Sequence, residues 1–192
     1  MNTLIFNGAG GNRNGDFHRA VAAAVRHEAE VRGHEAAELD LDTMAIKPCV
    51  GCFACWLKHP GTCAIKDDEE PVLKAYIHSD TVVWLTPITF GGYSSALKKA
   101  LDRLIPSVLP FFIWSHGEIH HPPRYERRKR LIVLGTLPKA DEDAEKIFRD
   151  LVGRNAANLN SAGVGVAVIT ETFDPSAIGD AVRQAFAQSE VI

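Results

Sequence analysis

The chain has 192 residues, a mass of 21.0 kDa, 46% hydrophobic and 23% charged residues, and a formal net charge of −3 at pH 7. These values are those of a globular protein, and the small negative charge gives no general attraction to nucleic acid. Its apolar runs fall well short of the roughly 20 residues that cross a bilayer, and the N-terminus lacks the features of a signal peptide. We therefore expect one domain, residues 1–192, in the reducing cytoplasm, with no membrane partner.

Short apolar runs alternate with helical patterns along the chain. Four runs rich in β-branched residues lack in-out alternation, which is typical of parallel strands covered on both faces; they lie at 3–6, 81–86, 130–136 and 163–170. A more alternating fifth run, 34–41, is predicted as an edge strand. Helical spacing predicts helices over 17–31, 69–78, 97–104, 144–152 and a last one opening at Asp174-Pro175. This alternation indicates an α/β fold, a three-layer sandwich around a five-stranded parallel sheet.

Residues 105–129 fit neither a strand nor a regular helix and contain four prolines, so they are predicted to be an insertion. Its histidines, His116, His120 and His121, lack the further ligands that a metal site requires, which favours a solvated or interfacial loop. The basic run at 124–130 is interpreted as a solvated rim ahead of the next strand.

The loop after the first strand, "NGAGGNRNGD" (7–16), has four glycines and leads directly into a helix. Glycines allow backbone N–H groups to point inward, and a helix N-terminus adds partial positive charge, so the loop suits a phosphate. Its spacing matches neither the dinucleotide fingerprint nor the P-loop. A plain tight turn remains open for this loop taken alone.

The loop after the third predicted strand begins "TPITFGGYSS" (86–95) and combines Pro87, a Gly91-Gly92 pair and the aromatic residues Phe90 and Tyr93. Such a loop can lie against a planar ring while its amides reach the polar edge of that ring. Alone it would be explained as a helix entry with two turn glycines. Together with the first loop, it indicates a mononucleotide such as FMN at the carboxyl ends of adjacent strands.

Four cysteines, Cys49, Cys52, Cys55 and Cys63, lie in a cysteine-rich loop at 44–66 with the spacing C-x2-C-x2-C-x7-C. Closely spaced cysteines with a fourth from a nearby turn are typical of iron–sulfur sites with four thiolate ligands. Structural zinc more often uses two separated C-x2-C pairs. A dithiol switch, a disulfide and a loop with unligated thiols remain open.

The two glycine-containing loops and the cysteine block together resemble the FMN-dependent NAD(P)H oxidoreductases of the flavodoxin-like superfamily over roughly residues 2–170. Within that superfamily the cysteine block is similar to that of the iron–sulfur flavoproteins, where such cysteines hold a [4Fe–4S] cluster. The resemblance implies the flavodoxin-like strand order 2-1-3-4-5 and a homodimer or homotetramer with the flavin site near a subunit interface.

Three groups of FMN-binding residues follow from this resemblance. They are the phosphate loop (Gly8, Ala9, Gly10, Gly11, Asn12, Arg13, Asn14, Gly15, Asp16), the ring loop (Pro87, Ile88, Thr89, Phe90, Gly91, Gly92, Tyr93) and a third contact at Gly135-Thr136. The phosphate loop departs from the family pattern, because Ala9 and Asp16 replace hydroxyl or amide groups and Asp16 brings a carboxylate toward a phosphate. Arg13 is a candidate replacement partner for that phosphate.

The resulting prediction is an FMN-dependent oxidoreductase that passes reducing equivalents from NADH or NADPH to a small-molecule or protein acceptor. One alternative is an iron–sulfur flavoprotein that exchanges electrons between FMN and a [4Fe–4S] cluster. A second alternative, motivated by Ala9 and Asp16, is a cofactor-free flavodoxin-like binding domain.

Overall fold

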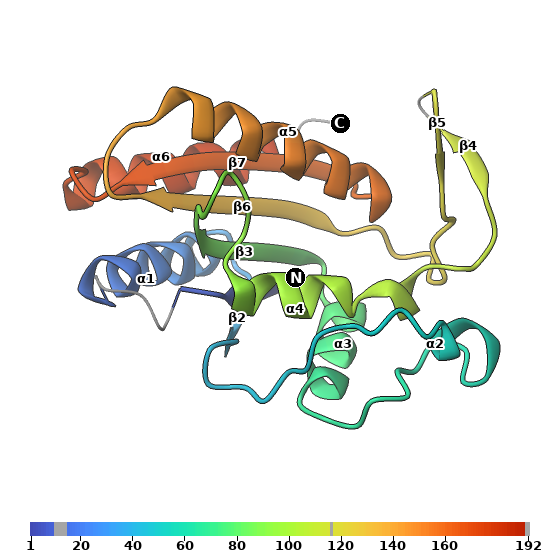
Figure 1. Ribbon diagram of the computed structural model, residues 1–192. Helices are drawn as coiled ribbons and strands as arrows, with labels where there is room; N and C mark the ends of the chain where they lie inside the picture. The colour runs from blue at the N-terminus through green and yellow to red at the C-terminus, as the bar shows by residue number, and fades with distance from the viewer. Residues whose placement is uncertain (10–14, 116, 191–192) are drawn as a thin grey trace.

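The computed structural model describes residues 1–9, 15–115 and 117–190, and a five-stranded parallel sheet forms its centre (Figure 1). The strands follow the order β2-β1-β3-β6-β7, which confirms the predicted order 2-1-3-4-5. They are β1 (Asn2–Asn7), β2 (Glu35–Asp40), β3 (Thr81–Pro87), β6 (Arg130–Leu137) and β7 (Gly163–Thr170). The side chains of β2 are exposed or half-buried, as expected of an edge strand.

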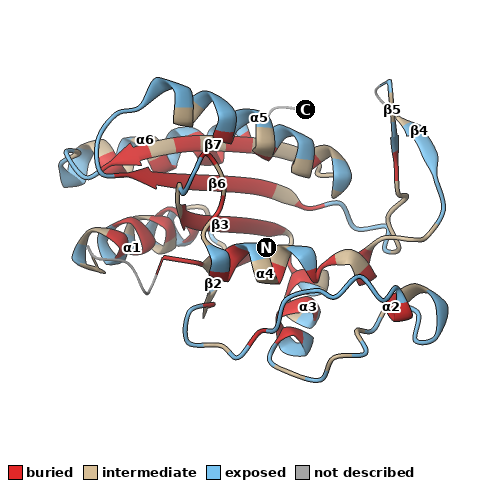
Figure 2. Ribbon diagram, in the orientation of Figure 1, coloured by how far each residue is buried: buried red, intermediate tan, exposed pale blue. Residues whose placement is uncertain are grey.

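Helices cover both faces of this sheet, as the three-layer prediction required. The helices α1 (Gly15–Val31) and α6 (Pro175–Gln188) pack on one face, and α3 (Glu69–His78), α4 (Ser95–Asp102) and α5 (Glu142–Asn158) pack on the other. Strand residues alternate between the two layers: Val82 and Trp84 of β3 contact the α3–α5 side, whereas Val83 and Leu85 contact the α1–α6 side. Both layers are apolar, which explains why the strand sequences show no in-out alternation. Figure 2 shows the buried sheet between the helices.

The insertion at 105–129 differs from its prediction, because it contains regular structure. A short 3-10 helix η1 (Ile105–Ser107) leads to an antiparallel hairpin of β4 (Ile113–Ser115) and β5 (Glu118–His120). These strands have three residues each and most of their side chains are exposed, so they carry no hydrophobic periodicity that a sequence pattern could detect. A one-turn helix, α2 (Ala54–Leu57), was also not predicted. Within the described residues, no helix is both long and apolar enough to span a membrane.

Candidate functional site

The described parts of the three predicted FMN-binding segments lie at the carboxyl ends of neighbouring strands. Strands β1, β3 and β6 are neighbours and parallel, so their carboxyl ends lie side by side. The Gly8 amide donates to the Leu85 carbonyl at 2.9 Å, and the Ile88 amide donates to the Thr136 carbonyl at 2.9 Å. These bonds join the loops after all three strands. This is the position at which open α/β sheets bind ligands.

Gly8 allows the loop after β1 to approach the start of α4. A Cβ atom on Gly8 would lie 2.8 Å from both Leu97 Cβ and Ser94 Oγ, closer than such atoms pack. Ser94 caps α4 by accepting a hydrogen bond from the Leu97 amide, so this first turn is well ordered. The phosphate-loop side and the ring-loop side of the candidate site therefore contact each other directly.

The ends of the predicted phosphate loop clarify its two departures from the family pattern, whereas Gly10–Asn14 lie outside the described residues. Ala9 is buried, and its amide donates to Asn7 Oδ1 at 3.0 Å. Gly15 begins α1, and the Asp16 side chain is 90% exposed and ion-paired with Arg19. The Asp16 charge is thus turned to solvent and neutralised by a neighbour. The expected repulsion between Asp16 and a phosphate is correspondingly weakened.

The ring loop forms a tight two-residue turn. Thr89 and Gly92 exchange both backbone hydrogen bonds at 2.9 Å, and the central residues Phe90 and Gly91 have φ values of 50° and 74°. Two positive φ angles are the mark of a type I′ turn, and a non-glycine residue in this region is uncommon. Within the described part of the chain, the amides of Phe90 and Gly91 donate to no protein acceptor. The turn therefore holds two free N–H groups beside the strand ends.

The two aromatic residues of this loop point in opposite directions. Phe90 is fully exposed, whereas Tyr93 is buried and packs edge-on against Trp84 and Phe148. The Tyr93 hydroxyl accepts a hydrogen bond from Asn155 Nδ2 at 2.9 Å, and burial raises the pKa of Tyr93 to about 12. The family resemblance includes Tyr93 among the residues of the ring loop. The structure instead places the Tyr93 ring in the core, because the apolar groups on β3 and α5 bury it.

The third expected contact, Gly135-Thr136, lies at the carboxyl end of β6, as predicted for an FMN contact. Both residues, however, already contact other parts of the protein. A Cβ atom on Gly135 would lie 2.6 Å from Phe148, so packing against α5 already requires glycine there. The Thr136 hydroxyl is 2.9 Å from Nε2 of the buried His18, which was not singled out from the sequence. His18 connects the first turn of α1 to the end of β6. The only sequence signal for it is a polar residue on the buried face of a helix.

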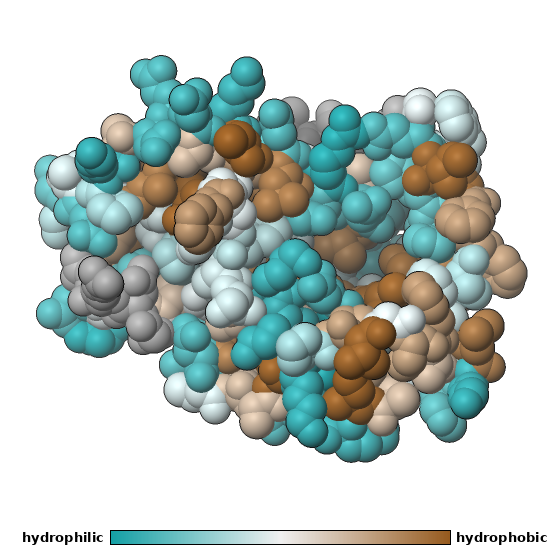
Figure 3. Space-filling view, viewed as in Figure 1, coloured by the Kyte–Doolittle hydropathy of each residue, from teal (hydrophilic) through white to brown (hydrophobic). Residues whose placement is uncertain are grey.

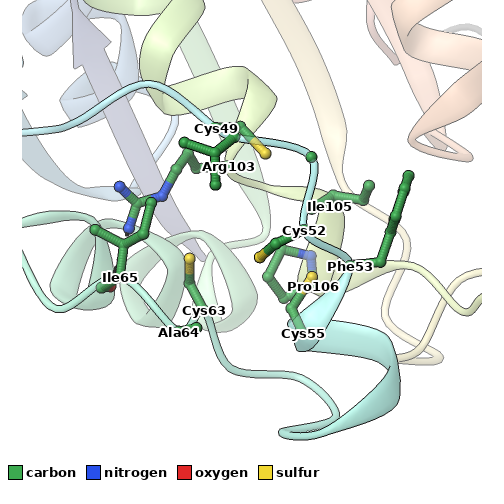
Figure 4. A pocket seen from close by; sticks show the side chains of 12 residues that line it. Cys49, Cys52, Phe53, Cys55, Cys63, Ala64, Ile65, Arg103, Ile105 and Pro106 are labelled. Atoms are coloured by element: carbon green, nitrogen blue, oxygen red, sulfur yellow. Dashed lines mark hydrogen bonds between the residues drawn. The ribbon is translucent and has the colours of Figure 1, made fainter.

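The four cysteines line one pocket at the other end of α4 (Figure 4). The remaining walls include the apolar residues Val50, Phe53, Ile105 and Pro106. Gly51 and Phe53, with φ values of 65° and 53°, turn the chain so that the first three cysteines face the same space. All four are free thiols; Cys49 and Cys52 are exposed, Cys63 is half-buried and Cys55 is buried.

The surroundings of Cys55 oppose a free thiolate. Burial raises the pKa of the Cys55 thiol, and negative charge on Cys63 raises it further. A thiolate at this position therefore needs a positive partner, and a metal centre provides one. Arg103 also lines this pocket; burial alone would lower the Arg103 pKa, but its hydrogen bond with Asp67 and negative charge on Cys63 raise it.

The arrangement of the thiols bears on the kind of metal centre. A single zinc ion with four thiolates at about 2.3 Å would bring the sulfur atoms to within about 4 Å of each other. Among the described residues, no three Cys, His, Asp or Glu side chains are placed to share one ion. A four-iron cluster spreads its thiolates more widely, since each iron takes one of them. The spacing C-x2-C-x2-C-x7-C supplies four thiolates, the donor set that iron–sulfur clusters use.

The candidate flavin and cysteine sites are separated by the length of one helix. The ring loop precedes the first residue of α4, whereas Arg103 and Ile105 in the cysteine pocket follow its last residue. An α-helix of eight residues is about 12 Å long. Figure 1 shows the cysteine loop and α2 at the end of the molecule near the hairpin, away from the ring loop.

The histidines of the insertion make structural contacts. His120 Nδ1 is 3.0 Å from Asn158 Oδ1, and His121 Nδ1 is 2.8 Å from the Phe111 carbonyl oxygen. His121 also packs against Trp56 of the cysteine loop, with ring centroids 4.8 Å apart. His116 lies outside the described residues. The two described histidines join the hairpin to Asn158, Phe111 and Trp56 of the same chain.

The chain is similar in sequence to known iron-sulfur flavoproteins. The chain resembles an iron-sulfur flavoprotein of Archaeoglobus fulgidus, with 39% identity over 103 residues, or 54% of this chain and 48% of the relative. It also resembles an iron-sulfur flavoprotein of Methanocaldococcus jannaschii, with 35% identity over 79 residues, or 41% of this chain and 40% of the relative. The matches therefore span about half the length of these relatives or less.

Solved structures share the fold along nearly the whole chain. An NAD(P)H:quinone oxidoreductase from Methanothermobacter marburgensis superposes with a TM-score of 0.69 at 15% identity, covering 98% of this chain and 97% of the other. An FMN-dependent NADH-azoreductase from Bacillus anthracis, in complex with FMN, gives a TM-score of 0.62 at 13% identity, with coverage of 98% and 96%. The family model for NADPH-dependent FMN reductase matches residues 1–121. The chain therefore belongs to the NADPH-dependent FMN reductase family.

Proposed function

We propose that the protein binds FMN at the carboxyl ends of β1, β3 and β6 and passes reducing equivalents from NADH or NADPH to a small-molecule or protein acceptor. The observation that carries this proposal is the pair of free amides at Phe90 and Gly91, held by a tight turn beside the strand ends. Bound FMN supplies the redox chemistry, accepting a hydride and releasing electrons one or two at a time.

The protein's part is to bind and orient this cofactor. The amides of Phe90 and Gly91 would donate hydrogen bonds to the polar edge of the flavin ring and stabilise negative charge that develops there. The N-terminus of α1, which begins at Gly15, would favour the phosphate, with Gly8–Asp16 as the phosphate loop and Arg13 as its cationic partner. Phe90, whose side chain is fully exposed, would restrict what can approach the ring.

A second candidate function is that of an iron–sulfur flavoprotein, in which Cys49, Cys52, Cys55 and Cys63 hold a [4Fe–4S] cluster. One observation favours it: the four thiols line one mostly apolar pocket, in which burial raises the pKa of the Cys55 thiol. The curated relatives bear the name iron-sulfur flavoprotein. The two functions are compatible, because the cysteine pocket and the flavin site occupy opposite ends of α4.

An absorption spectrum of the anaerobically prepared protein tests both functions. We expect flavin bands, oxidation of NADH or NADPH coupled to reduction of an added acceptor, and, after anaerobic reconstitution, iron and acid-labile sulfide near four per chain. Cys63→Ser should lose most of the iron and keep the flavin, since Cys63 is remote from the ring loop.

Each function has its own contrary result. A protein that stays colourless and shows no thermal shift with excess FMN would favour the cofactor-free binding domain. A flavin spectrum without iron or sulfide after reconstitution would leave the thiols unligated and would reject the cluster alone.

We also infer a cytoplasmic homodimer or homotetramer. The hairpin and the residues just before it expose Phe111, Phe112, Trp114 and Ile119, which we call the hairpin patch, and Val50 and Leu57 of the cysteine loop are exposed as well. Figure 3 shows apolar side chains gathered on this side of the molecule. Large exposed apolar patches usually mark contact surfaces.

Substituting the hairpin patch tests this assembly. We expect Phe111→Ser combined with Trp114→Ser to shift the protein toward the monomer in size-exclusion chromatography with light scattering. Val31→Ser removes an exposed apolar side chain at the end of α1 and should leave the assembly unchanged. A monomeric wild-type protein at micromolar concentration would contradict the inference.

A further inference from the structure

Arg103 is the largest charged side chain buried in the described structure, and it lies at the cysteine pocket. It follows the last residue of α4 and is only 1% exposed. Arginine is almost never buried to this extent without ionic and hydrogen-bonded partners. The identity of its partners therefore indicates what the side chain does.

The guanidinium binds the two ends of the cysteine loop at once. Nη1 donates to the Lys47 carbonyl at 2.9 Å, and Nη2 donates to the Ile65 carbonyl at 3.2 Å. Lys47 lies two residues before Cys49, and Ile65 lies two residues after Cys63. One planar group therefore joins the chain on either side of the four cysteines.

Asp67 completes this closure from the C-terminal side of the loop. Arg103 donates to both carboxylate oxygens of Asp67, at 2.7 and 2.8 Å, in a two-pronged ion pair whose side chains are 1% and 5% exposed. Asp67 also accepts from the Lys47 amide at 3.0 Å and from the Glu69 amide at 3.1 Å. Burial alone would raise the Asp67 pKa, but these hydrogen bonds outweigh it and lower the pKa to about 2.

The loop has little regular structure of its own, and its other anchor is Trp56, whose Nε1 donates to the Ile105 and Val108 carbonyls at 3.2 and 3.0 Å. Between Lys47 and Ile65 the only regular element is the single turn of α2, and the sheet does not extend into this segment. Closing a flexible loop of this length costs conformational entropy, which contacts between its ends must offset. A guanidinium suits this task because its fixed fork of donors can satisfy a carboxylate and carbonyl groups together.

The side chain acts on the thiols through the backbone. Its hydrogen bonds go to two carbonyl groups and one carboxylate, and Figure 4 shows the guanidinium on the Ile65 side of the pocket, with the sulfur atoms of Cys52 and Cys55 on the other side. We propose that Arg103 is the positioning residue of the cysteine site, holding both ends of segment 47–67 so that the four thiols surround one pocket before any cofactor binds. This positioning role stands without the proposed function, and only the assignment of a [4Fe–4S] cluster to the pocket rests on it.

Thiol alkylation tests the positioning role without a cofactor. The exposed Cys49 and Cys52 act as internal references, while Cys55 and Cys63 report opening of the loop. In Arg103→Met under native conditions, we expect iodoacetamide to label Cys55 and Cys63 at least about tenfold faster, because loss of the closure favours local opening. Hydrogen exchange of amides 47–67 should accelerate, and that of β6 should not.

Matched variants separate positioning from general stability. Arg103→Lys keeps the charge but cannot span the three acceptors, so it should also open the loop, and Asp67→Asn should have the same effect. Arg149→Met removes a surface arginine paired with Glu145 and should change neither readout. If Arg103→Met, Arg103→Lys and Asp67→Asn all accelerate amide hydrogen exchange in β6 as much as in segment 47–67, Arg103 stabilises the core in general and the proposal is overturned.

Anaerobic reconstitution with ferrous iron and sulfide then distinguishes this proposal from the cluster assignment. If the wild-type protein takes up a cluster, Arg103→Met should retain less iron and lose it faster on gel filtration. If the wild-type protein takes up none while Arg103→Met still exposes Cys55, the cluster assignment fails and the positioning role stands. Wild-type alkylation rates in Arg103→Met would overturn the positioning role whatever the iron content.

Discussion

We expect Gly91→Val to abolish retention of FMN through purification. Gly91 has a φ of 74°, and a Cβ atom there would lie 2.7 Å from Cγ2 of Ile147 on α5. A β-branched residue in this conformation costs on the order of 1–3 kcal/mol in backbone strain alone. The turn must therefore open or move, and the free amides of Phe90 and Gly91 lose their place beside the strand ends. The measurement is flavin absorbance of the purified variant, followed by FMN titration monitored by fluorescence.

The adjacent glycine provides the matched control. A Cβ atom on Gly92 would find its nearest neighbour at 3.7 Å, an ordinary contact, and Gly92 does not have a positive φ. Gly92→Ala should therefore retain FMN as the wild type does. Circular dichroism and the thermal midpoint should show that Gly91→Val is still folded. Undiminished FMN binding by folded Gly91→Val would show that the 87–93 loop does not form the ring site.

The second large effect concerns Glu69, at the first turn of α3. Its carboxyl group is 1% exposed, and neither oxygen has a hydrogen-bond partner within the described residues. Burial raises the Glu69 pKa to about 8, although the charge of Arg103 acts in the opposite direction. The folded protein therefore holds a proton on this group at neutral pH, whereas an unfolded chain releases it above about pH 4.3.

This proton makes stability depend on pH. Between about pH 5 and pH 8 the folded state binds more protons at Glu69 than the unfolded state, so the group lowers the free energy of unfolding as pH rises, by at most about 1.4 kcal/mol per unit. We expect Glu69→Gln, which has nearly the same shape and no charge, to remove this dependence and to be more stable than the wild type at pH 8. Urea denaturation at pH 5, 6, 7 and 8 measures both proteins.

At each pH, the difference in free energy of unfolding between the wild type and Glu69→Gln reports on the Glu69 carboxyl, because the other titrating groups are the same in both proteins. Glu70→Gln is the control, because Glu70 is exposed and pairs with Lys74 and Lys66 on the surface. That variant should follow the wild-type pH dependence. Parallel curves for wild type and Glu69→Gln would mean that the Glu69 carboxyl is ionised in the folded protein, with Arg103 as its partner.

Much of the fold could be predicted because its signals are local. The runs at 81–86 and 130–136 are apolar throughout because helices bury both faces of the sheet, and the more polar run at 34–41 forms the edge strand β2. The Ser94 and Asp174 caps mark helix starts, as the observed side-chain hydrogen bonds show. Each of these features depends on residues within a few positions of one another.

Features that depend on distant partners could not be predicted. The direction of the Tyr93 ring depends on Phe148 and Asn155 in α5, and the burial of His18 depends on Thr136 in β6. The hairpin of the insertion has strands of three residues with exposed aromatic side chains, so it carries no periodic signal. In each case the deciding neighbour is more than 50 positions away or the element is too short to show a pattern.

The cysteine block shows this division most clearly. The sequence by itself determined the number and spacing of the cysteines, the strand identities and the glycines that the two candidate FMN loops need, because these are properties of short segments. Only the tertiary structure decided that the four thiols line one pocket and that Arg103 closes the loop from beyond α4. The reason is that spacing limits how far apart residues can lie, whereas packing between remote segments decides which of them meet.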